Sequence, residues 1–222
     1  MFTPFANLET DPAIHGFLHS PSNPNGDAVV LTHGAGANCQ SKLLVAISEA
    51  LAASGFTVLR FDLPFRRARP HGPPAFGAAS KDRDGLRRAA EIMRSKTNGR
   101  IFLGGHSYGG RQATILISEE PQVVDGMLLL SYPLHPPRKP DELRTKHFPK
   151  LAKPCFFVHG TRDPFGTIAE MQSALKLIPA AQVLFESPGV GHDLLPKSAP
   201  ESFLAEVATS FEHFCAQILL DK

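Results

Sequence analysis

Short apolar runs alternate with longer amphipathic runs along the chain. Most apolar runs are continuous, as in strands that helices cover on both faces, and the longer runs repeat their apolar residues at helical spacing. The predicted strands cover residues 13–21, 28–34, 56–64, 100–107, 124–134, 155–160 and 181–189. The predicted helices cover residues 41–55, 81–99, 108–120, 165–179 and 199–222. This alternation favours an α/β fold with a doubly wound, mostly parallel sheet and helices on both faces.

Two segments lack this periodicity. Residues 65–80 are rich in proline, glycine and arginine, which predicts a long loop, and residues 135–154 are irregular and predict one helical turn at most. No internal repeat, low-complexity segment or linker divides the 222 residues, a length that suits one α/β domain with a full core. We therefore expect a single domain over residues 1–222.

Composition and charge argue against several classes of protein. The net charge of +2 is too small to indicate a nucleic-acid partner. Cys39, Cys155 and Cys215 are far apart and form no CxxC pair, which argues against a disulfide framework or a zinc site. Residues 1–16 lack the basic and apolar regions of a signal peptide, and no apolar run approaches the ~18 residues of a membrane span. We expect a cytoplasmic protein with no nucleic-acid or membrane partner.

The segment Gly105–Gly109, GHSYG, fits the pattern G-x-S-x-G between a predicted strand and a predicted helix. Such a match arises by chance in roughly one chain in ten of this length, so its position matters more than the pattern. A serine on a sharp strand-to-helix turn projects its hydroxyl from the sheet edge, and the helix N-terminus behind it favours negative charge. The alternatives, a phosphate or dinucleotide loop, need GxxxxGK[ST] or GxGxxG, which are missing. We therefore predict that Ser107 is a nucleophile.

A nucleophilic serine needs a histidine base and an acid that orients the base. Where the serine lies on such a turn, the chain order is serine, acid, histidine. Asp163 follows a predicted strand and His192 lies between the last predicted strand and helix, so both match this order. The alternatives are that Asp163 caps the next helix and that His192 is an ordinary loop residue. Asp193 is a poor candidate for the acid, because it is adjacent to His192 and adjacent side chains diverge. An alternative position for the acid, after the strand GMLLL, holds Ser131, which is not an acid.

Stabilising a tetrahedral oxyanion requires backbone donors beside the serine. Residues 32–38, THGAGAN, follow an early strand and have small side chains that let N–H groups approach a ligand. We predict that the N–H groups of Ala35 and Tyr108 form the oxyanion hole, with Gly34 as the alternative to Ala35. The histidines at strand ends are predicted to be structural, because the chain order places the base elsewhere. They are His33, His106 and His159.

An arginine-rich segment follows the strand that ends near Asp62. Arg66 and Arg67 are candidates, with Arg69, for binding an acidic acyl or phosphate group of the substrate through bidentate contacts. The alternative is a solvated or structural loop with surface ion pairs, which charge runs form more often.

These motifs together resemble the α/β-hydrolase superfamily over nearly the whole chain. A narrower resemblance is to a small, nearly lidless branch related to dienelactone hydrolases, which includes the KANL/Tex family of predicted hydrolases. It is carried by the segments VLTHGAGAN, GFTVLRFDLPFRRARPHGPP, GGHSYGGR and LLLSYPLHPPRKPDELRTKHFPKLAKPCFFVHGTRDPFG. The superfamily implies triad roles for Ser107, Asp163 and His192 and an oxyanion hole near Ala35 and Tyr108. Many members insert a large cap where this chain has only residues 135–154, which implies a minimal lid and an open pocket.

We therefore expect a serine hydrolase that cleaves a small ester or thioester through an acyl-enzyme intermediate. The partner would be this small-molecule substrate, the chemistry needs no metal or organic cofactor, and we expect a monomer or homodimer. An alternative is a catalytically weak or inactive α/β-hydrolase-fold protein that acts as a protein-interaction module, since the branch includes members that act within protein assemblies. A dehalogenase on the same scaffold would carry aspartate in place of Ser107.

Overall fold

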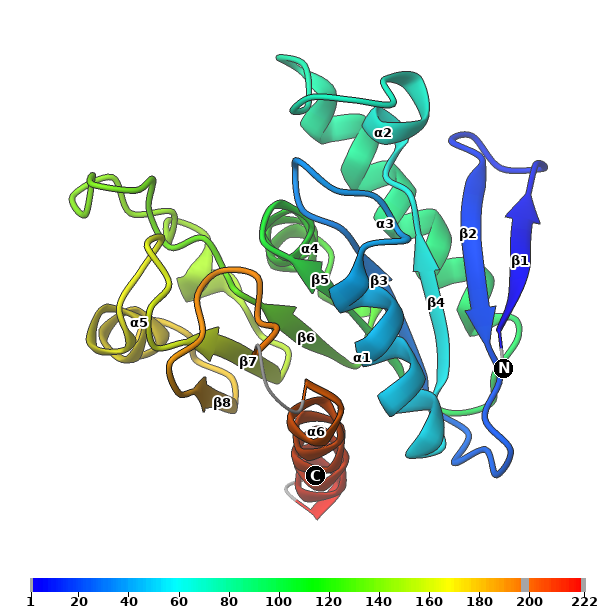
Figure 1. Cartoon of the computed structure of the whole chain (residues 1–222). Coiled ribbons are helices and arrows are strands. Elements are labelled where there is room, and N and C mark those ends of the chain that lie inside the picture. Colours follow the sequence, from blue (N-terminus) through cyan, green and yellow to red (C-terminus); the bar gives the residue numbers. More distant parts are fainter. Residues whose placement is uncertain (1, 197–199, 221–222) are drawn as a thin grey trace.

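The computed structural model describes residues 2–196 and 200–220, and in these ranges the chain forms one eight-stranded sheet with the order β1-β2-β4-β3-β5-β6-β7-β8 (Figure 1). The strands are β1 (Phe2–Asn7), β2 (Ile14–His19), β3 (Ala28–Thr32), β4 (Thr57–Phe61), β5 (Ile101–His106), β6 (Gly126–Leu130), β7 (Cys155–Gly160) and β8 (Gln182–Ser187). The six strands β4, β3, β5, β6, β7 and β8 are parallel to one another, while β2 pairs antiparallel with β4 and β1 pairs antiparallel with β2 at the edge of the sheet. The predicted doubly wound, mostly parallel sheet is confirmed.

Helices cover both faces of the sheet, which explains why its central strands are continuously apolar. The helices are α1 (Lys42–Ala53), α2 (Pro64–Ala68), α3 (Ala78–Arg94), α4 (Tyr108–Glu119), α5 (Ile168–Leu175) and α6 (Pro200–Leu220), with 3₁₀ turns η1 (Pro121–Val123) and η2 (Phe148–Lys150). Apolar residues of α1 and α6 pack on one face, and those of α3, α4 and α5 on the other. The two layers of side chains form separate buried clusters, and β3 and β5 lie between them.

Two elements differ from the sequence expectations. The strand β1 was not predicted, because it is an exposed edge strand with Pro4 inside it and shows little apolar periodicity. The predicted loop over residues 65–80 is wrong in part, because α2 begins at Pro64 and α3 already begins at Ala78. Proline at the first helical position has no N–H to satisfy, which suits a short helix such as α2. The predicted terminal helix also included residues 199, 221 and 222, which lie outside the described residues.

The segment between β6 and β7 contains one helical turn, η2, as its irregular sequence predicts. This short connection is consistent with the expected minimal lid. The three cysteines are buried, and their thiols are free. Within the described ranges, no helix is long and apolar enough to cross a membrane.

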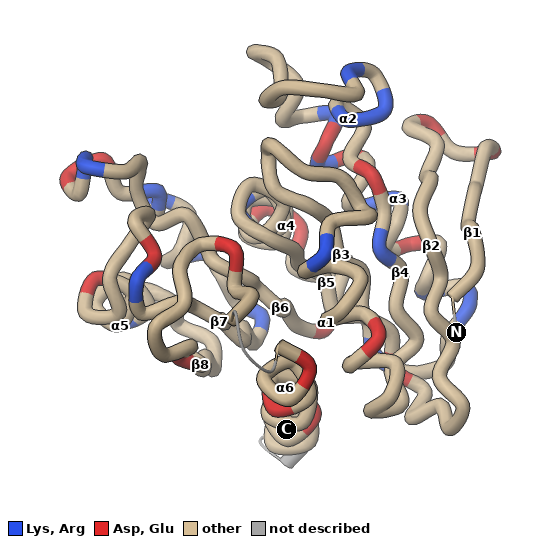
Figure 2. The backbone as a smooth tube through the Cα atoms, viewed as in Figure 1, with Lys and Arg blue, Asp and Glu red and all other residues tan. Residues whose placement is uncertain are grey.

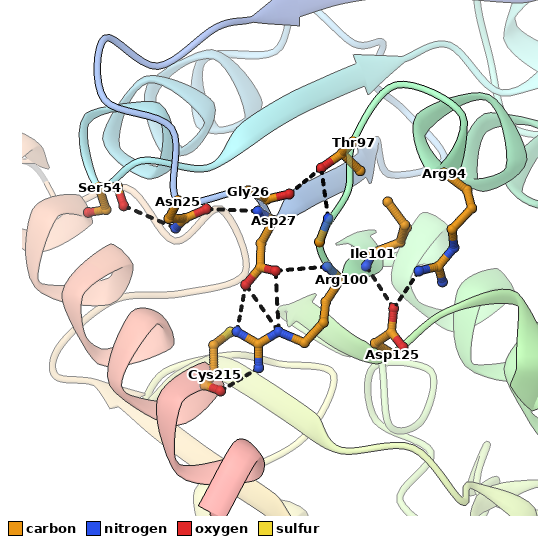
Figure 3. A network of polar contacts seen from close by, with 11 residues as sticks. Asn25, Gly26, Asp27, Ser54, Arg94, Thr97, Arg100, Ile101, Asp125 and Cys215 are labelled. Carbon is orange, nitrogen blue, oxygen red and sulfur yellow. Dashed lines mark hydrogen bonds and ion pairs between the residues drawn. The ribbon is translucent and has the colours of Figure 1, made fainter.

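Polar contacts join the amino ends of the central strands (Figure 3). Asp27, just before β3, accepts hydrogen bonds from the backbone N–H of Arg100 at 2.8 Å and from its guanidinium at 2.5 Å. Arg100 also donates to the Cys215 carbonyl on α6 at 2.5 Å. Asp125, just before β6, accepts from the Ile101 N–H at 2.9 Å and from Arg94 at 2.8 Å. We call this set of contacts the amino-edge network.

Candidate active site

Ser107 lies on a sharp turn between β5 and α4, at the carboxyl end of the sheet. Its φ of 51° and ψ of −113° are unusual for a residue with a side chain. The flanking glycines let the turn lie directly against β3: a Cβ at Gly105 would lie 2.2 Å from the Thr32 carbonyl oxygen, and one at Gly109 would lie 2.7 Å from the His33 oxygen. The two glycines of the motif are therefore required by close backbone packing, and the turn presents Ser107.

Three side chains from distant parts of the sequence form one hydrogen-bonded chain. The Ser107 hydroxyl Oγ lies 2.8 Å from Nε2 of His192, and His192 Nδ1 lies 2.8 Å from Oδ2 of Asp163. Since a carboxylate accepts, Nδ1 carries the proton and Nε2 is free to accept from the serine. The structure thus brings together the three residues that the sequence singles out as nucleophile, acid and base.

The surroundings of Asp163 keep its carboxylate charged. Burial opposes the charge and alone would raise the pKa of Asp163, but hydrogen bonds from His192 and from the Phe165 N–H outweigh burial and lower it. The alternative that Asp163 caps the following helix is not realised, because α5 begins with Thr167 as its cap, in a capping box with Glu170. Asp163 is therefore available to orient His192.

Contacts that the sequence did not reveal hold the loop of His192. His106 Nε2 donates to the His192 carbonyl at 2.8 Å, and the Phe165 ring lies 4.2 Å from the His192 ring, centroid to centroid. Burial, the largest influence, lowers the pKa of His106 to about 4, so this ring is neutral near pH 7. His106 is the residue before the nucleophile, so one hydrogen bond joins the serine turn to the loop of the base.

The segment after β3 lies beside Ser107, where an oxyanion hole is needed. A Cβ at Gly34 would lie 3.5 Å from the Ser107 Cβ, so the Gly34–Ala35 peptide runs close to the serine. His33 Nδ1 donates to the Gly34 carbonyl at 2.9 Å, and its Nε2 accepts from the Leu63 N–H at 3.1 Å. Burial lowers the pKa of His33, consistent with a neutral ring. His33 thus contacts backbone and not the serine, as expected for a structural histidine.

Tyr108 begins α4, so its backbone N–H has no partner within the helix and faces the same end of the sheet as Ser107. Its phenol donates to Asp82 Oδ2 at 2.7 Å, and Asp82 Oδ1 accepts from the Phe65 N–H at 2.9 Å. Burial raises the pKa of Asp82, although these hydrogen bonds oppose the increase. A buried carboxyl group therefore links the start of α4 to α2, a contact that nothing in the sequence pattern pointed to.

The candidate arginines have different surroundings, and Figure 2 shows the basic residues around α2. Arg66 is buried and donates to backbone carbonyls, two of which belong to Ala35 and Ala37. These contacts favour the alternative of a structural role for Arg66 over substrate binding. Arg67 is exposed and borders a hollow next to β1 and β2, together with His15 and Asp62. Its role in substrate binding stays a prediction.

The comparisons with known proteins concern the family and the fold. Residues 25–219 match the family described as alpha/beta hydrolase domain. A dienelactone hydrolase from Anabaena variabilis is similar in structure, with a TM-score of 0.72 and 21% identity over 96% of this chain and 98% of that one. Est1E from Butyrivibrio proteoclasticus has a TM-score of 0.72 and 16% identity over 96% of this chain and 99% of that one.

A third similar structure is XC6422 from Xanthomonas campestris, described as a member of the a/b serine hydrolases without lid. Its TM-score is 0.66 and its identity 15%, over 96% of this chain and 92% of that one. At these identities the structural likeness shows the fold, which is that of dienelactone-hydrolase-like proteins. The match over residues 25–219 covers most of the sequence, and the chain belongs to the α/β-hydrolase family.

Proposed function

We propose that this protein is a serine hydrolase that cleaves a small ester or thioester through an acyl-enzyme intermediate. Membership of the family supports a hydrolase in general. The observation that carries the finer proposal is the hydrogen-bonded chain Ser107–His192–Asp163, with both distances at 2.8 Å. A serine on this kind of turn, with a histidine that accepts its proton and a buried carboxylate behind the histidine, is suited to acyl transfer.

The reaction would begin with attack of Ser107 Oγ on the substrate carbonyl carbon. His192 Nε2 takes the hydroxyl proton as the Oγ–C bond forms, and Asp163 stabilises the resulting imidazolium. The carbonyl oxygen becomes an oxyanion that the N–H groups of Ala35 and Tyr108 would stabilise. The tetrahedral intermediate then collapses: the bond from the carbonyl carbon to the leaving oxygen or sulfur breaks, and His192 gives the proton to the departing alcohol or thiol. Water then attacks the acyl-enzyme while His192 accepts its proton. The bond between Ser107 Oγ and the acyl carbon breaks, His192 gives the proton to Ser107 Oγ, and the acid is released.

The short connection after β6 supports a small, accessible substrate. Residues 131–154 contain only η2 as regular structure and add no separate covering domain. A large lid would enclose a long acyl chain and exclude water from it, and this segment is too short to do so. We therefore favour short acyl groups over long lipid chains, and we propose that residues 1–222 act as one catalytic domain.

The alternative of an inactive interaction module differs in what it requires of the site. A module has no need for a base within hydrogen-bond distance of Ser107, or for a charged acid behind the base. A histidine 2.8 Å from the Ser107 hydroxyl, with the buried carboxylate of Asp163 behind it, therefore supports the hydrolase over the module. The two functions predict different behaviour of the purified protein.

A panel of 4-nitrophenyl esters and acyl thioesters tests the proposal. The wild-type protein is expected to hydrolyse short acyl esters with saturation, to release 4-nitrophenol in an initial burst when deacylation is slower, and to prefer acetyl or butyryl over dodecanoyl groups. Ser107→Ala should abolish turnover while the circular dichroism spectrum stays unchanged. Equal rates for wild type and Ser107→Ala on every compound would sink the proposal.

A further inference from the structure

The buried guanidinium of Arg66 connects two backbone segments near the active site, residues 35–37 and residues 69–72. Its Nε donates to the Ala37 carbonyl at 2.7 Å, and Nη2 donates to the carbonyls of Ala35 at 2.8 Å and Gly72 at 3.0 Å. Its Nη1 donates to the Arg69 carbonyl at 3.1 Å. A guanidinium has five N–H donors, and these contacts use four of them. All four acceptors are backbone carbonyl oxygens, so this buried cation holds main chain in place.

Two of these carbonyls belong to the segment that would supply an oxyanion donor. The Gly34 carbonyl accepts from His33 Nδ1 at 2.9 Å and from the Ala37 N–H at 3.1 Å, which fixes the peptide plane between Gly34 and Ala35. The contact of Arg66 with the Ala35 oxygen fixes the next peptide plane. Ala35 therefore lies between two peptide planes that are both held, and the direction of its N–H is set by them.

The helix that carries Arg66 also contacts the second donor residue. The Phe65 N–H donates to Asp82, Asp82 accepts from the Tyr108 hydroxyl, and the Phe65 and Tyr108 rings pack edge to face with centroids 5.6 Å apart. The short helix α2 thus touches the residues of both predicted donors. Its position between them explains how an arginine outside the triad can influence catalysis.

We propose that Arg66 is a positioning residue that holds the oxyanion hole in its reactive geometry. This inference rests on the proposed function, because an oxyanion hole matters only if Ser107 attacks a carbonyl. Arg66 acts through the Ala35 and Ala37 carbonyls and does not touch the substrate. This role differs from the binding of an acidic acyl group, because most N–H donors of Arg66 already bind backbone carbonyls and are not free for substrate.

The test measures kcat and KM separately for 4-nitrophenyl acetate and for its carboxylate-bearing counterpart, 4-nitrophenyl hydrogen succinate. In Arg66→Gln, kcat is expected to fall about 10- to 100-fold for both esters, since misplacing an oxyanion donor weakens only the transition state. KM should stay within about threefold of wild type. Arg66→Lys should be intermediate, because a single ammonium cannot reach all four of these carbonyls.

Arg87→Gln is the matched control. Arg87 on α3 donates to Asp84 on the same helix and to Glu120 at the end of α4. This variant therefore also loses several hydrogen bonds of one arginine, at the end of α4 opposite to Ser107. Its kcat should equal that of wild type. A second readout is amide hydrogen exchange of peptides covering residues 33–39, which should become faster in Arg66→Gln and stay unchanged in Arg87→Gln.

Each outcome has a distinct meaning. A wild-type kcat in folded Arg66→Gln, with unchanged exchange, overturns the positioning role and leaves the proposed function intact. A rise of KM limited to the hydrogen succinate ester would show that Arg66 binds substrate instead. If the wild-type protein turns over neither ester nor any thioester, the proposed function and the inference both fall.

Discussion

The two ends of the parallel strands in this sheet are built in opposite ways. At the amino end, the amino-edge network joins Asp27 and Arg100 through close charged contacts, with a carboxylate oxygen 2.5 Å from the guanidinium. At the carboxyl end, Ser107 and Ser131 have positive φ angles of 51° and 47°, and the buried Ser131 hydroxyl lacks a hydrogen-bond partner within the described part of the chain. The amino end favours stability, and the carboxyl end retains strain.

The charged groups follow the same division. The carboxylates of the amino-edge network face guanidinium groups, as Asp125 faces Arg94. In the proposed triad, Asp163 accepts a hydrogen bond from His192, and burial lowers the pKa of the neighbouring His106, so that its ring is neutral. A fully paired ion network has little further chemistry available to it, whereas a carboxylate behind a histidine can stabilise a positive charge that forms on the ring during a reaction. The predictions below test this contrast, from the largest expected effect to the smallest.

Replacing Ser107 by glycine should separate activity from stability most clearly. Ser107→Gly removes the nucleophile, so kcat should fall about 10⁴-fold or more. The unusual backbone of residue 107 suits glycine better than serine, so the protein should gain about 1 kcal/mol in free energy of unfolding. Kinetics and urea unfolding measure the two effects. Ser107→Ala, which keeps a Cβ, is the control: it should lose the same activity without the gain in stability.

Replacing Asp163 should remove most of the activity while leaving the fold in place. Asp163→Asn offers no charged acceptor for the Nδ1–H of His192, so it neither keeps the proton on Nδ1 nor stabilises the imidazolium. We expect kcat to fall about 10³- to 10⁴-fold, the scale known for such a change in serine proteases. Steady-state kinetics on 4-nitrophenyl acetate provides the measurement. Asp193, the carboxylate that follows His192 in the sequence, offers a matched control. Asp193→Asn should keep kcat within about twofold of wild type. A larger loss in Asp193→Asn than in Asp163→Asn would show that the acid is assigned wrongly.

At the amino end the opposite result is expected. Asp27→Asn leaves the half-buried Arg100 guanidinium without its charged partner and should lower the free energy of unfolding by about 2–3 kcal/mol. The carboxyl end is not altered, so kcat per folded molecule should stay unchanged. Urea unfolding and active-site titration give the two quantities. A large fall in kcat per folded molecule, in addition to the fall in the free energy of unfolding, would indicate that the two ends are coupled.

Acid should weaken the contact between His106 and the loop of His192 before it protonates the carboxylates of the amino-edge network. The folded-state pKa of His106 lies near 4, below its usual value of 6.5, so the unfolded chain binds more protons between these pH values. The stability that depends on neutral His106 is therefore full above about pH 6.5 and is lost as pH falls toward 4, by roughly 1–2 kcal/mol at pH 5. Asp125, whose burial is outweighed by contacts with Ile101 and Arg94, has a lowered pKa and stays charged in this range.

Urea unfolding at pH 7 and pH 5 tests this dependence. In His106→Gln the fall in stability between the two pH values should be about 1 kcal/mol smaller than in wild type. The control is His213→Gln, on the exposed side of α6, which should keep the wild-type fall. An unchanged fall in His106→Gln would show that His106 is not the group that takes up the proton.

The parts of the molecule that were predictable are those with local signals. Continuous apolar runs mark the strands β3 to β7, and the order of serine, aspartate and histidine selects Ser107, Asp163 and His192 without knowledge of distances. The edge strand β1 and the helix α2 were missed, because the exposed side of one and the proline- and glycine-rich surroundings of the other hide their periodicity.

The role of Arg66 was not predictable for a different reason. A run of arginines looks the same in sequence whether its side chains are exposed or buried, and here Arg66 is 6% exposed while its neighbour Arg67 lies on the surface. Two acceptors of Arg66 are the carbonyls of Ala35 and Ala37, about thirty residues away, and backbone carbonyls leave no mark in a sequence. The link from Asp82 to Tyr108 is hidden in the same way, since it depends on the packing of α3 against α4.

The central claim is that Ser107 is an activated nucleophile, and a fluorophosphonate probe tests it most directly. The purified protein would be treated with the probe and the adduct mapped by mass spectrometry. The account predicts one adduct per chain, on Ser107, that is absent in Ser107→Ala and strongly reduced in His192→Ala. A folded wild-type protein that gains no adduct on Ser107, or gains one at the same rate without His192, would contradict it.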